Sequence, residues 1–325
     1  MEYNISSFKP FTAIALILLL MPGCLVAGLS EREITSLAGD VDLQGHRGAR
    51  GNRPENTLPA FIYCIEHGMT TIELDTVLTK DKHLIVCHDP VINSSLCIDD
   101  NGNPAKEVPI SELTVEEIKK LDCGAIRNDK FPEQVPVKNT RMVTLTEFFN
   151  FVKAYEKTAP GIRPPKFNIE TKFPKVRSRE DILEVAGIMV KTIEDAGMVE
   201  RTTVQSFVIE ILPEVKKLNK NLKISALFQP TKSQGLKMIL GFSANRSEIL
   251  ERTVAAGADI LSPYFLYVNP EFVKECHRHG IKVVPWTVND AKKIEELLNY
   301  GVDGIISDYP DLLLKVYKKW RAGKK

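Results

Sequence analysis

The chain of 325 residues lacks an excess of charge of either sign, with 43 basic residues against 42 acidic ones. A protein that binds nucleic acid usually carries a basic patch or stripe, so the balanced charge argues against that class of partner. Low-complexity tracts are also missing, and a hydrophobic content of 43% is sufficient for a packed core. The composition therefore indicates a globular protein of one large domain or two ordinary ones.

Metal-binding cysteine motifs are missing as well. The six cysteines include no Cys-x-x-Cys pair and no close cluster with histidine, which argues against a zinc site. Cys97 and Cys123 lie in one irregular segment and can form a disulfide in an oxidising compartment. Cys64 and Cys87 fall in apolar runs, where free cysteines are usually buried.

The N-terminus has one apolar run, Phe11 to Leu20, which is short for a membrane span of about 20 residues. The run ends at Pro22-Gly23, and the pattern is typical of an export signal. Cys24 resembles a bacterial lipoprotein site that would carry a lipid anchor, and ordinary cleavage after Gly28 is an alternative. A retained anchor helix is the third possibility. We expect residues 1–28 to be a signal peptide or lipoprotein signal, and the protein to be exported, either periplasmic or membrane-anchored.

Glycine, histidine and arginine are concentrated in one stretch. Residues 44–57 read QGHRGARGNRPENT, with His46 and Arg47 at the end of a short apolar run. Glycine lets the backbone approach a ligand closely, and the planar guanidinium of Arg47 is suited to phosphate. His46 is a candidate for proton transfer near neutral pH. Glu55 and Asn56, in the following turn, are expected to brace this loop.

Two carboxylates interrupt the next strand-like run. Glu73 and Asp75 are two residues apart among β-branched residues, so alternation places them on the same face of a strand. A hairpin through residues 80–82 is expected to bring His88 back near Asp75, within one residue of uncertainty in register. Asp89 would then orient His88.

A later strand, residues 166–171, carries Glu170 near its end, and Lys172 follows it. Two histidines, three carboxylates and two cations are the inventory that metal-assisted cleavage of a phosphate ester requires. Carboxylate oxygens suit Ca²⁺ or Mg²⁺ rather than zinc. Trp286 either lines the pocket or packs in the core. The remaining polar residues near these motifs are interpreted as loop-fixing residues or surface charge: Asn289, Ser307 and Asp308 as the former, Arg50 and Arg53 as the latter.

Strand-like and helix-like segments alternate along the chain. Predicted strands cover residues 41–45, 70–78, 166–171, 202–205, 223–228, 259–261, 281–287 and 304–307. Alternation predicts a parallel sheet with helices outside, and eight units predict a TIM (β/α)8 barrel. An open doubly wound sheet is the alternative, but its Gly-rich nucleotide fingerprint is missing. A small insertion of about residues 90–140, after the second barrel strand, interrupts the alternation within a domain of residues 40–325.

These motifs, in this order, resemble the glycerophosphodiester phosphodiesterase family, in its bacterial, exported form. The resemblance extends from about Val41 to the C-terminus. It rests on His-Arg-Gly, Pro-Glu-Asn-Thr, Glu-Leu-Asp and His-Asp-Pro between residues 46 and 90, and on residues 168–172, 285–289 and 303–310. It implies a TIM barrel with a small insertion, and hydrolysis of glycerophosphodiesters to sn-glycerol 3-phosphate and an alcohol.

The resemblance also implies roles for individual residues, which are acid and base for His46 and His88, metal ligation for Glu73, Asp75 and Glu170, and phosphate binding for Arg47 and Lys172. Trp286 is a further candidate for substrate binding, on its position at the end of a late strand. Calcium is the favoured cation and magnesium the alternative. Two other functions stay open. One is a phospholipase D that acts on lysophospholipids or sphingomyelin, and the other is a non-catalytic barrel that binds a ligand. The oligomeric state is not predicted.

Overall fold

The computed structural model describes residues 41–159, 161–239 and 245–324. The predicted signal in residues 1–28, with the proposed anchor at Cys24, lies outside these residues. Among the described helices, none is both long enough and apolar enough to cross a membrane.

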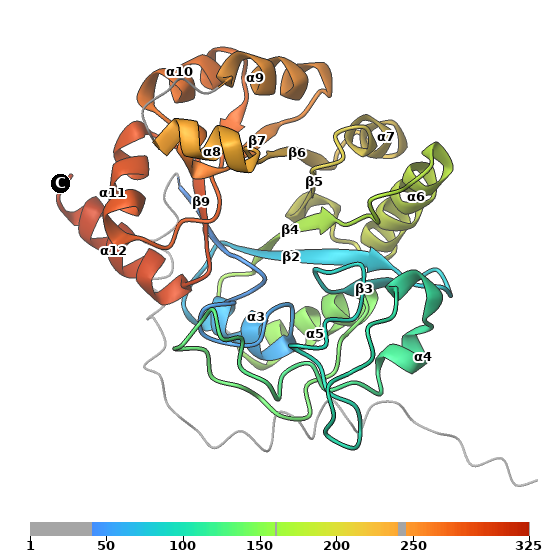
Figure 1. Cartoon of the computed structure of the whole chain (residues 1–325). Coiled ribbons are helices and arrows are strands. Elements are labelled where there is room, and N and C mark those ends of the chain that lie inside the picture. Colours follow the sequence, from blue (N-terminus) through green and yellow to red (C-terminus); the bar gives the residue numbers. More distant parts are fainter. Residues whose placement is uncertain (1–40, 160, 240–244, 325) are drawn as a thin grey trace, which may run out of the picture.

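Eight parallel strands form a nearly closed barrel, as predicted, and helices surround it (Figure 1). The strand order around the barrel is β8-β7-β6-β5-β4-β2-β1-β9. Two backbone hydrogen bonds join its ends, from Asp303 N to Val283 O (2.9 Å) and from Ile306 N to Pro285 O (3.0 Å). The strands are β1 (Asp42–Gly45), β2 (Thr71–Leu78), β4 (Lys166–Thr171), β5 (Thr202–Ser206), β6 (Lys223–Phe228), β7 (Ile260–Pro263), β8 (Lys282–Val283) and β9 (Gly304–Ser307).

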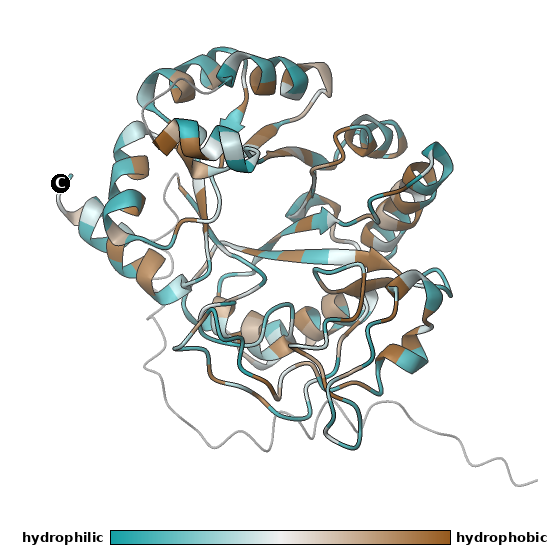
Figure 2. Ribbon diagram, viewed as in Figure 1, coloured by the Kyte–Doolittle hydropathy of each residue, from teal (hydrophilic) through white to brown (hydrophobic). Residues whose placement is uncertain are grey.

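The outer helices are amphipathic and pack their apolar faces on the strands (Figure 2). In α5, a capping box at Thr144 fixes the first turn, and Phe148 and Phe149 pack edge-on against Phe167 of β4 at centroid distances of 5.4 and 5.3 Å. The helices are α3 (Leu58–Glu66), α5 (Leu145–Thr158), α6 (Arg179–Asp195), α7 (Ile211–Leu218), α8 (Lys232–Ile239), α9 (Arg246–Ala255), α10 (Pro270–Arg278), α11 (Ala291–Tyr300) and α12 (Pro310–Ala322).

The prediction was wrong in one strand. The strand expected over residues 281–287 is β8, which covers only Lys282–Val283. Pro285 has no N–H to donate, so the regular ladder stops before it. Pairing resumes at Trp286, whose N–H donates to Pro263 O at 3.1 Å.

The insertion forms a small subdomain on β2. The hairpin strand β3 (Leu84–Val86) pairs antiparallel with β2, and beyond it Cys87 N donates to Asp75 O. Because His88 is the next residue, it lies near Asp75, within the one-residue uncertainty in register that was expected. A second hydrophobic cluster lies beneath the insertion, separate from the main core. Apart from the short helix α4 (Val115–Ile118) and one 3-10 turn, the segment consists of loops.

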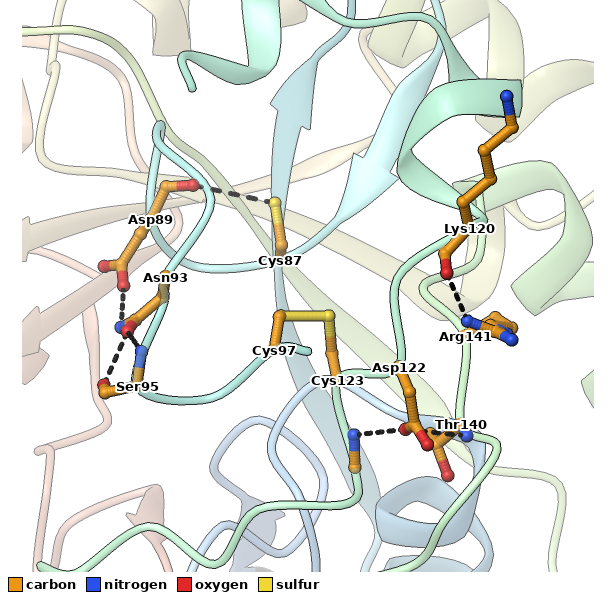
Figure 3. Close-up of a disulfide and its surroundings, with 11 residues drawn as sticks. Cys87, Asp89, Asn93, Ser95, Cys97, Lys120, Asp122, Cys123, Thr140 and Arg141 are labelled. Atoms are coloured by element: carbon orange, nitrogen blue, oxygen red, sulfur yellow. Dashed lines mark hydrogen bonds between the residues drawn. A yellow bond between two sulfur atoms is a disulfide. The ribbon is translucent and has the colours of Figure 1, made fainter. Parts of the chain in front are cut away.

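A disulfide between Cys97 and Cys123 links two of these loops (Figure 3). The neighbouring Asp122 accepts hydrogen bonds from the backbone N–H groups of Gly124 (3.0 Å) and Thr140 (3.1 Å). Cys64 is a buried free thiol, as expected, whereas Cys87 is half-buried. The disulfide and the Asp122 contacts together fix a segment that has little regular secondary structure.

Replacing both Cys97 and Cys123 with serine is expected to lower the free energy of unfolding by roughly 2–4 kcal/mol. The disulfide restricts the unfolded chain across a separation of 26 residues, and the double variant loses that restriction. Denaturant unfolding in oxidising buffer measures the change. Reduced wild-type protein serves as the control and should unfold at the midpoint of the double variant. An unchanged midpoint after reduction would contradict the pairing.

Candidate active site

Three buried carboxylates meet between β2 and β4, near the level at which β1 and β4 end. The parallel register places Asp75 opposite Glu170, and alternation along β2 places Glu73 on the same face as Asp75. One oxygen from each of the three lies within 4.8 Å of the others. The carboxyl ends of barrel strands are where TIM-barrel enzymes build their active sites.

The sharp turn after β1 brings backbone donors to these carboxylates. Arg47 has a φ of 49°, a left-handed conformation that is unfavourable for a residue with a side chain. In this conformation its N–H donates to Glu73 Oε2 at 2.8 Å. Gly48 follows with a φ of 79°, and a Cβ there would lie 2.8 Å from the backbone of Ala60. Close packing against α3 therefore requires glycine at this position.

Amide side chains support the carboxylates from the barrel interior. Asn56 donates to Asp75 Oδ2 at 2.8 Å, the bracing contact expected for this loop. Gln205 of β5 donates to Glu73 Oε1 at 2.7 Å. Gln205 itself accepts a hydrogen bond from Asn168, which also donates to Gln44 of β1. Gln205 was not predicted from the sequence, because a single polar residue in a short strand carries no recognisable signal.

Two cations are embedded among the carboxylates. Arg47 Nη1 lies 2.5 Å from Glu55 Oε1, and its Nε lies 3.2 Å from Asp75 Oδ2. Lys172 Nζ lies 2.6 Å from Glu170 Oε1 and 3.2 Å from Asp75 Oδ1. Both side chains are mostly buried, so these ion pairs are screened much less than surface pairs.

Burial and neighbouring charges shift the pKa values of the three carboxylates in different directions. Burial, and then the neighbouring charge of Asp75, raise the pKa of Glu73 well above its ordinary value. Burial likewise raises the pKa of Glu170 to about 7. For Asp75 burial acts in the same direction, but Lys172 and Arg47 outweigh it and hold the pKa well below its usual range. The protein groups alone therefore leave this cluster short of positive charge.

The donor set fits a divalent cation. Among the described residues, Asp75 Oδ1 and Glu170 Oε1 are buried without a hydrogen-bond donor, and the Lys172 ammonium lies 3.2 and 2.6 Å from them. Three carboxylates provide hard oxygen ligands, which Ca²⁺ and Mg²⁺ prefer. Buried carboxylates at this spacing are stabilised by such an ion.

His46 lies next to the carboxylate cluster. Its Nδ1 lies 2.6 Å from Asp308 Oδ1, and its Nε2 lies 4.0 Å from Glu73 Oε2. Burial lowers the pKa of His46 to about 4, despite the opposing effect of Asp308. In a neutral ring whose Nδ1–H donates to Asp308, Nε2 keeps a free lone pair directed toward the cluster.

Asp308 and Arg50 were misinterpreted from the sequence. Asp308, expected only to fix a loop, contacts His46 directly and also accepts from Asn289 at 2.7 Å. Arg50, expected to be surface charge, binds both carboxylate oxygens of Asp308 at 2.9 and 3.1 Å. The available signal was the position of Asp308 directly after the last barrel strand, at the face where the other candidates meet.

The second histidine has a similar partner. His88 Nδ1 lies 2.7 Å from Asp89 Oδ1, as the adjacency of the two residues suggested. The hydrogen bond to His88 is the main reason that the pKa of Asp89 falls to about 2. Asn93 donates to the other oxygen of Asp89 at 2.8 Å, which fixes the carboxylate from the insertion side. The His88 side chain is about one-third exposed, so it reaches solvent more readily than His46.

An open pocket joins these groups into one site, with an empty volume of about 900 Å³ that includes its solvent-open mouth. Both histidines, Arg47 and Lys172 line it, as do Glu73 and Glu170. Trp286 lines the same pocket and packs edge-on against Phe207 at 5.4 Å. Its Nε1–H donates to Ser262 O at 2.9 Å, so the orientation of the indole is fixed. Trp286 thus combines the two placements expected for it, because it faces the pocket and is anchored in the barrel.

Comparison with known proteins identifies the family. Residues 46–312 match the glycerophosphoryl diester phosphodiesterase family, a span that contains every residue that lines the pocket. The chain belongs to this family. A glycerophosphodiester phosphodiesterase of Caldanaerobacter subterraneus is 33% identical over 279 residues, which cover 84% of this chain and 96% of the relative.

Solved structures agree with the assignment to the glycerophosphoryl diester phosphodiesterase family. A Silicibacter pomeroyi protein assigned to the same activity superposes with a TM-score of 0.76 at 28% identity, covering 87% of this chain and 94% of that one. An Oleispira antarctica phosphodiesterase, solved with the product sn-glycerol-3-phosphate, shares the fold with a TM-score of 0.66 at 21% identity, covering 88% and 99%. Members of the family are phosphoric diester hydrolases, so this chain is an enzyme of that class.

Proposed function

We propose that the protein hydrolyses glycerophosphodiesters, such as glycerophosphocholine or glycerophosphoethanolamine, to sn-glycerol 3-phosphate and an alcohol. One observation carries the proposal: three carboxylates, two cations and two carboxylate-paired histidines surround a single pocket. This combination matches what cleavage of a phosphodiester needs, namely charge stabilisation and two proton transfers. The product bound to the Oleispira protein is the one that this reaction would release.

Glu73, Asp75 and Glu170 would hold a divalent cation, with Ca²⁺ favoured and Mg²⁺ as the alternative. When bound, the ion stabilises negative charge on the phosphoryl oxygens. The amide donors Asn56 and Gln205 keep two of the carboxylates in position. The other oxygen of Glu73 accepts from the Arg47 N–H, and the other oxygen of Asp75 lies 3.2 Å from Lys172 Nζ.

Arg47 and Lys172 are proposed to bind the phosphodiester. Each is already ion-paired with Asp75, so each is held at the edge of the carboxylate cluster without substrate. Glu55 anchors the far end of the Arg47 guanidinium, which limits the positions it can adopt. Fixed cations of this kind stabilise charge that grows in the transition state without reorganising at the moment of reaction.

His46 and His88 are proposed to transfer the protons. One takes a proton from the nucleophile, and the other gives one to the leaving alkoxide. Each Nδ1 is held by a carboxylate, Asp308 for His46 and Asp89 for His88, which leaves Nε2 for the reacting atoms. The nucleophile is either water or the 2-hydroxyl of the substrate glycerol, in which case water opens a cyclic phosphate.

Replacing Asp308 with asparagine is expected to lower kcat by roughly 10–100-fold with little change in KM. The asparagine amide keeps the shape but removes the charge that orients His46 and engages Arg50. Steady-state kinetics on glycerophosphocholine measures the split between kcat and KM. Asp290→Asn is the matched control, because this carboxylate only caps α11 on the surface. A rise in KM with an unchanged kcat would assign Asp308 to substrate binding instead.

A second candidate substrate is a lysophospholipid. A mostly apolar cavity lies beside His88, under the insertion, with an empty volume of about 470 Å³. Val91, Ile92 and Leu96 are among its lining residues, together with the Cys97–Cys123 disulfide. An apolar surface next to the catalytic pocket suits a substrate with a hydrocarbon chain. The cavity is the feature that favours phospholipase D activity as the alternative.

Product analysis distinguishes these substrates. Glycerophosphocholine and lysophosphatidylcholine are incubated separately with the protein in the presence of Ca²⁺ or Mg²⁺, and the phosphorus-containing products are identified. We expect sn-glycerol 3-phosphate from glycerophosphocholine and much slower release of lysophosphatidic acid. Faster turnover of the lysophospholipid would replace the first assignment with the second. Release of phosphocholine would contradict both, because the other ester bond would have been cut.

We also propose that the protein works outside the cytoplasm, either in the periplasm or attached to a membrane. The pairing of Cys97 with Cys123 supports this location, because such bonds persist in oxidising compartments. Fractionation of expressing cells tests the proposal, and replacing Cys24 with alanine separates a lipoprotein from a protein with a cleaved signal. Recovery of the chain in the cytoplasmic fraction with its thiols reduced would overturn it.

A further inference from the structure

A second large cavity opens at the end of the barrel opposite the active site. It has an empty volume of about 1100 Å³, including its open mouth, and is lined by the residues with which several barrel strands begin. Asp42, Lys166, Lys223 and Lys282 are the first residues of β1, β4, β6 and β8. The catalytic residues follow the opposite ends of the strands, so this cavity belongs to neither the pocket nor its mechanism.

The three lysines belong to the inward-facing set of their strands. Lys166 lies two residues before Asn168 in β4 and so on the same face of the strand, and the Asn168 side chain contacts Gln44 inside the barrel. Lys223 lies two residues before Ser225 in β6 and so on the same face, and the Ser225 hydroxyl forms a hydrogen bond with that of Ser262 at 2.9 Å inside the barrel. In a barrel of this type, alternate strands contribute the side chains of one layer.

Lys282 also points inward. Val284, two residues further along the chain and on the same face, lines the cavity together with it. With Asp42, the three lysines therefore form the first layer at this end of the barrel. A layer with three ammonium groups at one mouth needs either a counterion or full hydration.

The three lysines of this layer have no ion-pair partner within the described part of the chain, although the carboxylate of Asp42 lies in the same layer. The side chains of Lys166, Lys223 and Lys282 form no hydrogen bond with any described residue either. The carboxylates nearby are already engaged: Asp42 accepts from Gln44 at 2.9 Å and from Thr71 at 2.6 Å. Three ammonium groups therefore lie at one mouth without an ion pair, and Asp42 offsets their charge only in part.

The other acidic residues of the cavity are also engaged, apart from Glu200, which is exposed. Asp259 pairs with Lys216 at 3.0 Å, and Asp303 pairs with His277 at 2.8 Å. A further cation, Arg163, lines the same cavity, and its Nη1 is buried without a hydrogen-bond partner among the described residues. A buried donor left unpaired in a cavity indicates that an acceptor from outside the chain completes the site.

We propose that this cavity binds a phosphate group, supplied either by a free phosphate or phosphomonoester or by the headgroup of an anionic lipid. A phosphate brings a charge near −2 and several acceptor oxygens, which matches three ammonium groups and one unpaired guanidinium N–H. The bound group lies at the far end of the barrel from the reacting atoms, so it contributes a regulatory or anchoring contact and takes no part in hydrolysis.

Protection of lysines from acetylation tests the proposal on the full-length protein. An amine-reactive acetylating reagent is applied with and without inorganic phosphate, at constant ionic strength adjusted with chloride, and each lysine is read by mass spectrometry. We expect acetylation of Lys166, Lys223 and Lys282 to slow roughly tenfold at phosphate near ten times its dissociation constant. Lys220 and Lys232, which are exposed elsewhere, are the internal controls. Lys172 reports phosphate in the active site separately.

Two double variants complete the test. K223Q/K282Q is expected to abolish the protection of Lys166 while leaving turnover of glycerophosphocholine unchanged. K220Q/K232Q, which removes the same charge elsewhere, is expected to change neither. Vesicles of phosphatidylglycerol and of phosphatidylcholine separate the two sources. If the site binds an anionic lipid headgroup, phosphatidylglycerol vesicles protect the three lysines and phosphatidylcholine vesicles do not. If the site binds only free phosphate or a phosphomonoester, neither kind of vesicle protects them. Equal acetylation of the three lysines with and without phosphate and with either vesicle would overturn the proposal, as would protection that persists in K223Q/K282Q.

Discussion

Replacing His46 with glutamine is expected to lower kcat on glycerophosphocholine by about 10²- to 10⁴-fold, the usual contribution of a positioned acid or base. Glutamine fills similar space but cannot exchange a proton near neutral pH. The fold should survive, because the main partner of His46 is Asp308, which Arg50 and Asn289 still hold. Steady-state kinetics measures the effect, and KM should change little.

The matched control is His83→Gln, because His83 is an exposed residue of the hairpin and lies outside the pocket. Its kcat should equal that of the wild type. His88→Gln should fall in the same range as His46→Gln, and the double variant should lose less than the product of the two effects, since both residues act in one reaction. Wild-type kcat in either single variant would remove that histidine from the proton-transfer role.

Replacing Glu170 with glutamine is expected to abolish activity that depends on a divalent cation and to weaken cation binding by more than the roughly 10–100-fold typical of a supporting partner. Glu170 contributes one of three carboxylates to the cluster, and glutamine removes the charge while keeping the shape. Thermal unfolding reads binding independently of turnover. At a cation concentration about 100 times its dissociation constant, the wild type should gain about 2.7 kcal/mol, and the variant should gain almost nothing.

Glu184→Gln is the control for this experiment, since Glu184 is a surface residue paired with Lys82. Its cation-induced stabilisation should match that of the wild type. Stabilisation of Glu170→Gln by the same cation to the same extent would show that the ion binds elsewhere. Activity retained by Glu170→Gln without any cation would show that the carboxylate cluster serves another purpose.

Most of the barrel could be predicted because its signals are local. A run rich in β-branched residues marked β2, the alternation of strand-like and helix-like segments marked β4 and β6, and helical periodicity marked the outer helices. The failure at β8 has a local cause too, since Pro285 breaks the ladder that its apolar neighbours suggested. The second hydrophobic cluster beneath the insertion was not predicted, because its residues come from the β2–β3 hairpin, two short helical turns and several loops, and follow no regular spacing.

The carboxylate cluster and the histidines were predictable because each interrupts or ends a strand. Glu73 and Asp75 are buried charges in an apolar run, which draws attention in any sequence. Asp308 and Arg50 gave no such signal. Asp308 is 262 residues from His46, and only the closure of the barrel brings the two side chains together. Contacts of this kind depend on tertiary structure, and spacing along the chain does not reveal them.

The most direct test of the account is the activity of protein stripped of metal. The full-length chain is treated with EDTA, freed of the chelator, and assayed for release of sn-glycerol 3-phosphate from glycerophosphocholine before and after Ca²⁺ or Mg²⁺ is restored separately. We expect no release from the stripped protein, recovery with one of the two ions, and no recovery in Glu170→Gln. Undiminished release from protein shown to contain no divalent cation would contradict it.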